Sequence, residues 1–339
     1  MRLLLVKLSS LGDVVHALPA VTDAARALPG LDVHWVVEEG YQAIPVLHGA
    51  VTRVIPVAIR RWRGHWRGAR REIGDFVRGI RAEAYDVVLD SQGLIKSAVV
   101  ARFGRGRHVG FDAASARERV ASLGYRCGVS VGRQQHAIDR QRALFAGALG
   151  YPMPTDAIDY GLRVRRGETS GLVLAHGTTW SNKRWPESFW AELAIRVLSR
   201  GERVTLPWGT PDERARAHRI AALAPGVEVA QPLDLRAMIE LLANAAAVVS
   251  ADSGIGHLAS ALGVRTLALY GPTDAGLTGC RGASVTNLSA QFACAPCLER
   301  RCGYRGAPVL VDEVSVEPPC FSTITPERVW RALCDSAGL

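Results

Sequence analysis

The chain has 339 residues, of which 48% are hydrophobic and 22% are charged, and its mean hydropathy is only +0.08. Such a length favours two domains of ordinary size. No apolar run approaches the ~18 residues of a membrane-crossing helix, and the apolar start is too short for a signal peptide. These features predict a cytoplasmic protein. The formal net charge of +9 favours an anionic partner, which is nucleic acid, anionic lipid or a phosphorylated substrate.

Short apolar runs alternate with helix-length segments through both halves of the chain. This pattern is typical of parallel strands that helices cover on both faces. We predict strands at 3–6, 33–37, 53–57, 86–90 and 108–111 in the first half, and at 172–176, 203–207, 227–230, 247–251 and 266–271 in the second.

The stretch between the two halves is rich in Pro and Gly and has no periodicity, which predicts a linker. Near the end, Thr325 followed by Pro326 is a typical helix start. The predicted organisation is a domain at 1–152, a linker at 153–170, a second domain at 171–322 and a terminal helix within 323–339. A ligand cleft is expected between the domains, at the carboxyl ends of their strands.

A polar loop follows the first predicted strand and leads into a helix. It runs Lys7-Leu8-Ser9-Ser10-Leu11-Gly12-Asp13, so Asp13 sits at the helix start. The helix dipole favours an anionic carboxylate there, which is the form that a general base needs. The structural alternative is that Asp13 only caps the helix.

Residues 58–71 hold six arginines and no acid, and Trp62 and Trp66 lie four apart, on one face if the segment is helical. Arginine binds phosphate and carboxylate through a rigid fork, and tryptophan favours membrane interfaces. The segment therefore suits docking to an anionic lipid headgroup. A solvated run of charge is the alternative.

Two loops in the second half suit a diphosphate. One carries Thr178, Thr179 and Lys183, whose hydroxyls and ammonium can bind phosphate oxygens. The other starts with Asp252 and a helix start at Ser253, whose amides would face an anion. Capping by the threonines is the structural alternative.

The second loop also allows a different interpretation. Residues 254–259 match the pattern GxGxxA after a strand, and Asp274 follows about 20 residues on, as in a dinucleotide site. That pattern would indicate an NAD-dependent oxidoreductase. It does not account for Asp252 and His257.

Taken together, the motifs resemble those of the lipopolysaccharide heptosyltransferase family, whose members use ADP-heptose. Gly12, Asp13, Leu18 and Pro19 match the family's first loop and its Leu-Pro helix entry. Residues 252–258 resemble its Asp-Thr/Ser-Gly-x-x-His-Leu donor motif. The string VIPVAIRRWR and other matches make the resemblance strongest to the type I members.

This resemblance implies the GT-B fold, with two Rossmann-like domains facing across a cleft. It implies inverting transfer of L-glycero-D-manno-heptose from ADP-heptose to Kdo of Kdo2-lipid A, by a peripheral protein on the cytoplasmic face of the inner membrane, with no cofactor. Asp13 would be the base. The donor would bind Thr178, Thr179, Lys183, Glu213, Asp252, Ser253, Gly254 and His257, and the acceptor would bind Ser10, Arg60, Arg61, Lys96 and Arg117.

The cysteines leave a further question open. Cys294, Cys297, Cys302 and Cys320 have a spacing that could hold zinc, or they are reduced residues that pack a loop. Similar strings occur in type II members of the family, so a type II enzyme with another acceptor remains an alternative. A nucleic-acid binder is a third class, but arginines outside 58–71 are interleaved with acids, and we expect no nucleic-acid partner.

Overall fold

The computed structural model describes residues 1–65 and 67–337. The chain forms two compact units, Met1–Arg163 and Val164–Leu339. The boundary falls inside the segment 153–170 that the sequence marks as a linker. Residues 338–339, at the end of the predicted terminal helix, lie outside the described residues.

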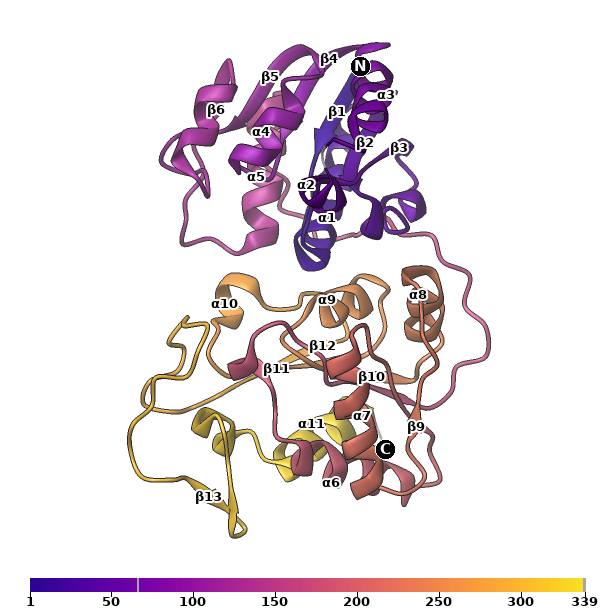
Figure 1. Cartoon of the computed structure of the whole chain (residues 1–339), viewed down its shortest axis with the longest axis vertical. Coiled ribbons are helices and arrows are strands. Elements are labelled where there is room, and N and C mark those ends of the chain that lie inside the picture. The colour runs from indigo at the N-terminus through magenta and orange to yellow at the C-terminus, as the bar shows by residue number, and fades with distance from the viewer. Residues whose placement is uncertain (66, 338–339) are drawn as a thin grey trace. The chain divides into compact units, whose positions relative to one another are not determined.

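The first unit is a parallel sheet with helices packed on it (Figure 1). The strand order is β3-β2-β1-β4-β5-β6. The strands are β1 (Arg2–Val6), β2 (Asp32–Glu38), β3 (Val51–Val57), β4 (Ala84–Asp90), β5 (Arg105–Phe111) and β6 (Cys127–Val129). The helices are α1 (Leu11–Ala27), α2 (Ile59–Gly64), α3 (Arg70–Arg81), α4 (Ile95–Ala101) and α5 (Ala137–Leu149), with 3-10 turns η1 (Glu39–Tyr41), η2 (Pro45–Leu47) and η3 (Arg119–Gly124).

The second unit has a sheet of the same topology, in the order β12-β11-β10-β7-β8-β9. Its strands are β7 (Leu172–Ala175), β8 (Val204–Leu206), β9 (Glu228–Val229), β10 (Ala247–Ala251), β11 (Thr266–Tyr270) and β12 (Val285–Ser289), with a small hairpin of β13 (Leu310–Val311) and β14 (Val314–Ser315). The helices are α6 (Glu187–Leu198), α7 (Pro211–Leu223), α8 (Leu235–Ala243), α9 (Gly254–Ala261), α10 (Ala275–Thr278) and α11 (Pro326–Ala337), with 3-10 turns η4 (Ser181–Lys183) and η5 (Pro319–Thr323).

Both sheets therefore follow the Rossmann strand order, in which the chain reverses direction across the sheet beside the first strand. The reversal lies between β1 and β4 in the first unit, and between β7 and β10 in the second. Val6 is in register with Asp90, and Ala175 with Ser250. The loops that follow each of these strand pairs must therefore start side by side, which is where such folds place their ligands.

The core of the second unit is built around three aromatic rings. Trp185 packs edge-on against Trp190, with ring centroids 4.9 Å apart, and against Phe189 at 5.5 Å. The Trp185 indole donates to the carbonyl of Ile324 at 2.7 Å. Helix α11 adds Val329 to this core, so the terminal helix is part of the second unit.

Two edge strands, β6 and β12, are absent from the predicted set. Edge strands bury only part of their surface, so their sequences lack the continuous apolar run that marks a central strand. Cys127 and Gly128 are exposed in β6, as is Asn287 in β12. Within the described residues, no helix is both long and apolar enough to span a bilayer.

Candidate active site

The carboxylate of Asp13 lies in the first turn of α1, directly after β1 and its loop. Its Oδ2 accepts hydrogen bonds from the backbone N–H of Ser10 at 2.8 Å and from the Ser10 hydroxyl at 2.9 Å. The capping contact that the sequence allows is thus present. Both bonds end on Oδ2, and in the described part of the chain Oδ1 accepts no hydrogen bond. Asp13 is half-buried.

Gln92, which follows β4, holds the loop that precedes Asp13. Its side-chain oxygen accepts from the backbone N–H groups of Leu8 at 3.0 Å and Ser9 at 3.2 Å. Its amide nitrogen donates to the carbonyl of Ser9. This buried side chain forms three bonds to two adjacent residues and so fixes the path of the loop.

Two buried charges lie beneath this loop. Lys7 donates to the carbonyl of Ser91 at 3.0 Å. Burial lowers the pKa of Lys7, while the carboxylates of Asp13 and Asp90 act in the opposite direction. Asp90 is fully buried, and it accepts from the Tyr125 hydroxyl at 2.6 Å and the Ser97 hydroxyl at 2.8 Å. Burial raises the pKa of Asp90 despite these bonds.

The motif-based assignment did not include Lys7, Asp90 or Gln92 as site residues. A signal for Lys7 existed, because only three of the 41 basic residues are lysines: Lys7, Lys96 and Lys183. All three lie on loops or helix starts at the carboxyl edges of the sheets.

The structure brings three of the predicted acceptor residues to the Asp13 loop. Ser10 bonds Asp13 directly, as described. The ammonium of Lys96, at the start of α4, donates to the Ser9 hydroxyl at 3.3 Å. Arg117 is close enough for its charge to lower the pKa of Lys7. This edge of the sheet therefore combines one half-buried carboxylate with several cations.

Arg60 and Arg61 are held elsewhere. The Arg61 guanidinium forms ion pairs with Glu39 at 3.1 Å and Glu72 at 2.6 Å. The Arg60 side chain lies over the Tyr41 ring, 5.4 Å from its centroid. In the described part of the chain, no contact joins either arginine to the Asp13 loop. Residues 58–71 contain no acid, but carboxylates from other elements neutralise part of their positive charge.

The segment 58–71 is not one continuous helix, which is the condition under which Trp62 and Trp66 would share a face. Helix α2 ends at Gly64 and α3 begins at Arg70, and Trp66 lies outside the described residues. The Trp62 ring packs edge-on against Phe76 at 5.6 Å, on a cluster of the first unit's core. Trp62 is therefore a packing residue rather than an exposed anchor.

In the second unit, three residues contact Asp252, which directly follows β10. The Lys183 ammonium lies 2.6 Å from Asp252 Oδ2. Thr273 donates to the same oxygen at 2.5 Å, and Thr178 donates to the Asp252 carbonyl at 3.0 Å. Lys183 also lies over the Trp180 ring, 4.3 Å from its centroid. Thr273 was not among the predicted donor residues.

Helix α9 begins beside this cluster. Ser253 is its N-cap and Gly254 its first residue, so their amides lie at the positive end of the helix, as predicted. His257 is buried, with Nδ1 3.5 Å from the Cys280 sulfur.

Glu213 and Thr179 complete the predicted donor set. Glu213 Oε2 caps α7 by accepting from the N–H of its N-cap Thr210 at 3.2 Å, and it also accepts from the N–H of Gly209 at 2.8 Å. It also borders the donor loop, since a Cβ built on Gly177 would lie only 2.6 Å from its Oε1. Thr179 is exposed, unlike Thr178, and its hydroxyl is accessible to a ligand.

The four clustered cysteines line one small cavity. Cys320 is buried there, and burial together with the neighbouring thiols raises its pKa to about 12. Among residues 1–65 and 67–337, however, no group of three or more His, Cys, Asp or Glu side chains is placed to hold a metal ion. The structure brings the four thiols to one cavity, and both interpretations of these cysteines, a zinc site and a packed loop, stay predictions.

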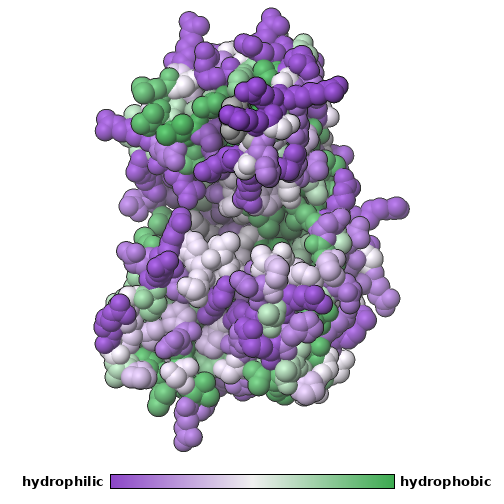
Figure 2. All heavy atoms as spheres, in the orientation of Figure 1, coloured by the Kyte–Doolittle hydropathy of each residue, from purple (hydrophilic) through white to green (hydrophobic). Residues whose placement is uncertain are grey.

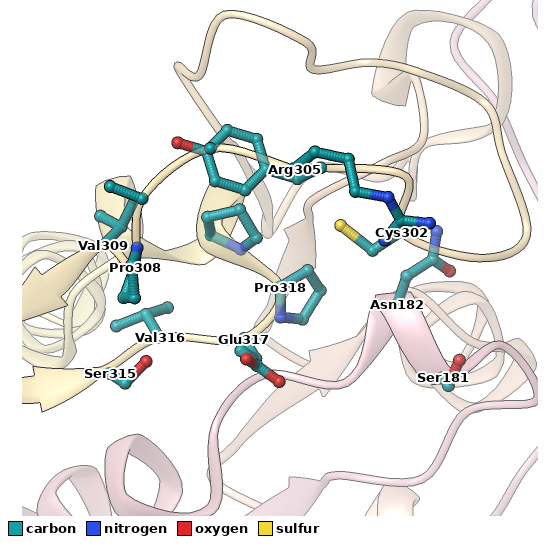
Figure 3. A pocket seen from close by; sticks show the side chains of 14 residues that line it. Ser181, Asn182, Cys302, Arg305, Pro308, Val309, Ser315, Val316, Glu317 and Pro318 are labelled. Carbon is teal, nitrogen blue, oxygen red and sulfur yellow. The ribbon is translucent and has the colours of Figure 1, made fainter.

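A larger cavity of about 450 Å³ lies next to these cysteines. Figure 3 shows Asn182 of η4 close to Cys302 and Arg305, with Pro308, Val309 and Val316 on the other side of the cavity. None of the predicted donor-binding residues lines it. It is therefore distinct from the cluster around Asp252.

Comparison with known proteins agrees with this geometry. The model of glycosyltransferase family 9 (heptosyltransferase) matches residues 73–307. Lipopolysaccharide heptosyltransferase 1 of Pseudomonas aeruginosa is 49% identical, over 98% of this chain and 97% of that protein. The structure of E. coli heptosyltransferase WaaC with ADP matches with a TM-score of 0.86 at 39% identity, covering 99% of this chain and 100% of that one. A second WaaC structure, with ADP-2-deoxy-2-fluoro heptose, matches with a TM-score of 0.82 at 38% identity, covering the same shares.

These similarities cover both units and identify the GT-B fold. They also decide between the two interpretations of the loop after β10, because the relatives transfer a sugar. The GxGxxA match therefore does not indicate an NAD-dependent oxidoreductase. The chain belongs to glycosyltransferase family 9, the heptosyltransferases, and is a glycosyltransferase.

Proposed function

We propose that this enzyme transfers L-glycero-D-manno-heptose from ADP-heptose to Kdo of Kdo2-lipid A, with inversion at the anomeric carbon. The observation that carries the proposal is the meeting of Thr178, Lys183 and Asp252 at the start of α9. Asp252 begins the stretch that resembles the family's donor motif, and Thr178 and Lys183 resemble the family's diphosphate contacts. The chain aligns almost end to end with a type 1 enzyme.

The donor diphosphate binds at the loop after β7 and the start of α9. The amides of Ser253 and Gly254 and the hydroxyls of Thr178 and Thr179 donate to its oxygens. Lys183 turns from Asp252 toward the phosphate and neutralises charge as ADP departs. Glu213, beside Gly177, accepts hydrogen bonds from a sugar hydroxyl of the donor.

The acceptor hydroxyl is activated by Asp13. Its free oxygen removes the hydroxyl proton while the acceptor oxygen forms a bond to the anomeric carbon, from the face opposite ADP. The bond from that carbon to the phosphate oxygen breaks, and ADP leaves with the electron pair. Lys96 and Arg117 suit the carboxylate of Kdo.

We propose that no metal is required, since Lys183 and the helix start supply positive charge to the departing diphosphate. Chelation with EDTA is then expected to leave turnover unchanged. We also propose peripheral contact with the cytoplasmic face of the inner membrane, because the acceptor is a lipid.

The deciding experiment measures ADP release by the purified enzyme with ADP-heptose and either of two acceptors. One is Kdo2-lipid A, and the other is the same lipid already carrying one heptose. Release with the first alone is the expected result. Release with the second alone would assign the enzyme to type II, and release with neither would remove support for this acceptor class.

A further inference from the structure

Four large apolar side chains are exposed on neighbouring elements of the first unit. Ile95 and Val99 lie on α4, with 48% and 53% of their surface exposed. Val120 and Leu123 lie on η3, with 59% and 84% exposed. We refer to these four residues as the apolar patch. Exposed apolar groups of this kind, when contiguous, mark interaction sites.

The geometry makes the patch contiguous. Ile95 and Val99 are one helical turn apart, and Val120 and Leu123 are three apart in a 3-10 turn, so each pair shares a side. The two elements pack against each other. A Cβ built on Gly124 of η3 would lie 3.2 Å from the Cβ of Ala98 on α4.

The start of α4 is also tied to the residue before η3. The N–H of Ile95 donates to the Glu118 carboxylate at 2.7 Å. Figure 2 shows a group of hydrophobic side chains on the part of the first unit that carries α4 and the chain before β6, with hydrophilic side chains around it.

The border of the patch is strongly basic. Exposed cations surround it at Lys96, Arg102, Arg117, Arg119 and Arg126. Glu118 is the acid within this group, and its carboxylate is engaged by the start of α4. In the described part of the chain, Arg102, Arg119 and Arg126 form no ion pair.

We infer that the apolar patch and its basic border form the surface by which this enzyme docks on an anionic lipid bilayer. Apolar side chains enter the boundary between headgroups and acyl chains, while arginines bind lipid phosphates. Charge complementarity favours this occupant over a second copy of the chain, because two copies facing each other through this border would bring cations together.

The same helix links the patch to the active site. Ile95 and Val99 face outward from α4, whereas Lys96 donates to the Ser9 hydroxyl in the loop before Asp13. Docking through α4 thus places that loop close to the headgroups. This consequence rests on the proposed function, in which the acceptor sugar is carried by a membrane lipid.

The apolar patch, rather than residues 58–71, is then the membrane contact, because Trp62 packs inward and Arg61 is paired.

The test compares vesicle binding by the full chain and two variants. Val120→Ser/Leu123→Ser removes apolar groups that are already exposed, so folding should be little affected. Ile195→Ser/Leu223→Ser makes the same kind of change at exposed positions of the second unit, 48% and 55% exposed. Cosedimentation uses vesicles of phosphatidylcholine alone or with phosphatidylglycerol, without donor or acceptor.

Binding of the wild type to the anionic vesicles is expected to fall at least tenfold in the patch variant and to stay unchanged in the control. The proposal fails if the patch variant binds vesicles like the wild type. It also fails if the substitutions leave vesicle binding unchanged and alter only the molecular mass in solution, which would show that the patch joins two copies of the chain.

A second experiment measures turnover with Kdo2-lipid A in vesicles and with its water-soluble, deacylated form. The patch variant should lose activity only on vesicles. If the wild type lacks activity on both acceptors, the proposed function fails while the binding result still decides the docking surface.

Discussion

The ammonium of Lys183 lies 2.6 Å from the carboxylate of Asp252, at the start of the helix that we assign to the donor diphosphate. Both side chains are largely buried, with 14% and 7% of their surface exposed. Each charge therefore depends on the other, because a lone charge in such a place is costly. Under the proposed function, the pair holds the ammonium in position for the donor diphosphate.

Replacing Lys183 separates this binding role from its structural role. Lys183→Met is expected to weaken ADP binding at least tenfold in calorimetry, because it removes a charge-assisted contact. It should also destabilise the fold, since Asp252 loses its partner at a cost of up to about 3 kcal/mol. The double variant Lys183→Met/Asp252→Asn should recover stability but not affinity. Recovery of both would show that Lys183 acts on the fold alone.

Asp13→Asn tests the base. Asparagine keeps an oxygen that caps α1, so stability should change by less than about 1 kcal/mol. It cannot take the acceptor's proton, so kcat should fall by about 10² to 10⁴. The dissociation constant of ADP, measured on the same protein, should be unchanged. Near wild-type turnover would show that another group is the base.

Gln92→Ala tests whether the loop before Asp13 must be held in place. The change leaves the N–H groups of Leu8 and Ser9 without their acceptor and should cost roughly 2 kcal/mol of stability. We expect kcat to fall at least tenfold while the KM of the donor stays constant. The control is Leu144→Ala, which opens a cavity in the core of the same unit and should lower folding stability by about 2 to 5 kcal/mol. An equal loss of kcat in that control would show that Gln92 affects turnover only through the stability of the fold.

Burial of His48 predicts a pH-dependent stability. Its Nδ1 accepts from the N–H of Ala50 at 3.1 Å, and Nε2 lies 2.9 Å from the Thr22 hydroxyl, an arrangement that suits the neutral ring. Burial lowers its pKa from 6.5 to about 4, although Asp159 acts in the opposite direction. Arg163 adds to the lowering.

Because the folded pKa lies below the unfolded one, the unfolded chain takes up the proton first as the pH falls. The stabilisation is complete above about pH 6.5 and is lost progressively toward pH 4. Urea unfolding followed by circular dichroism should show this loss, with His48 contributing a slope of at most about 1.4 kcal/mol per pH unit. His48→Gln should make the dependence shallower. An unchanged slope would assign the effect to other residues.

The central strands and the donor motif could be predicted from the sequence because both are local signals. Residues 247–251 form an apolar run as long as a buried strand, and Asp252 follows it directly. Lys183 and Thr178 were predicted for the same reason, as polar groups on a loop after a strand. Their contact with Asp252 follows from the register of β7 with β10.

The missed residues depend on contacts between distant parts of the chain. Gln92 holds a loop more than 80 residues before it, and Thr273 reaches Asp252 from the next strand's loop. Neither contact has a local pattern. The resemblance of the string VIPVAIRRWR implied an acceptor role for Arg61. The string does not reveal that the neighbours of Arg61 in space are Glu39 and Glu72.

The boundary between Arg163 and Val164 separates two compact units, each with its own sheet. A mutation in one core need not repack the other. Under the proposed assignment, the choice of acceptor can therefore drift within residues 1–163 while nucleotide recognition stays under selection in residues 164–339. Chimaeras joined at this bond would exchange acceptor preference between relatives without redesigning the donor half.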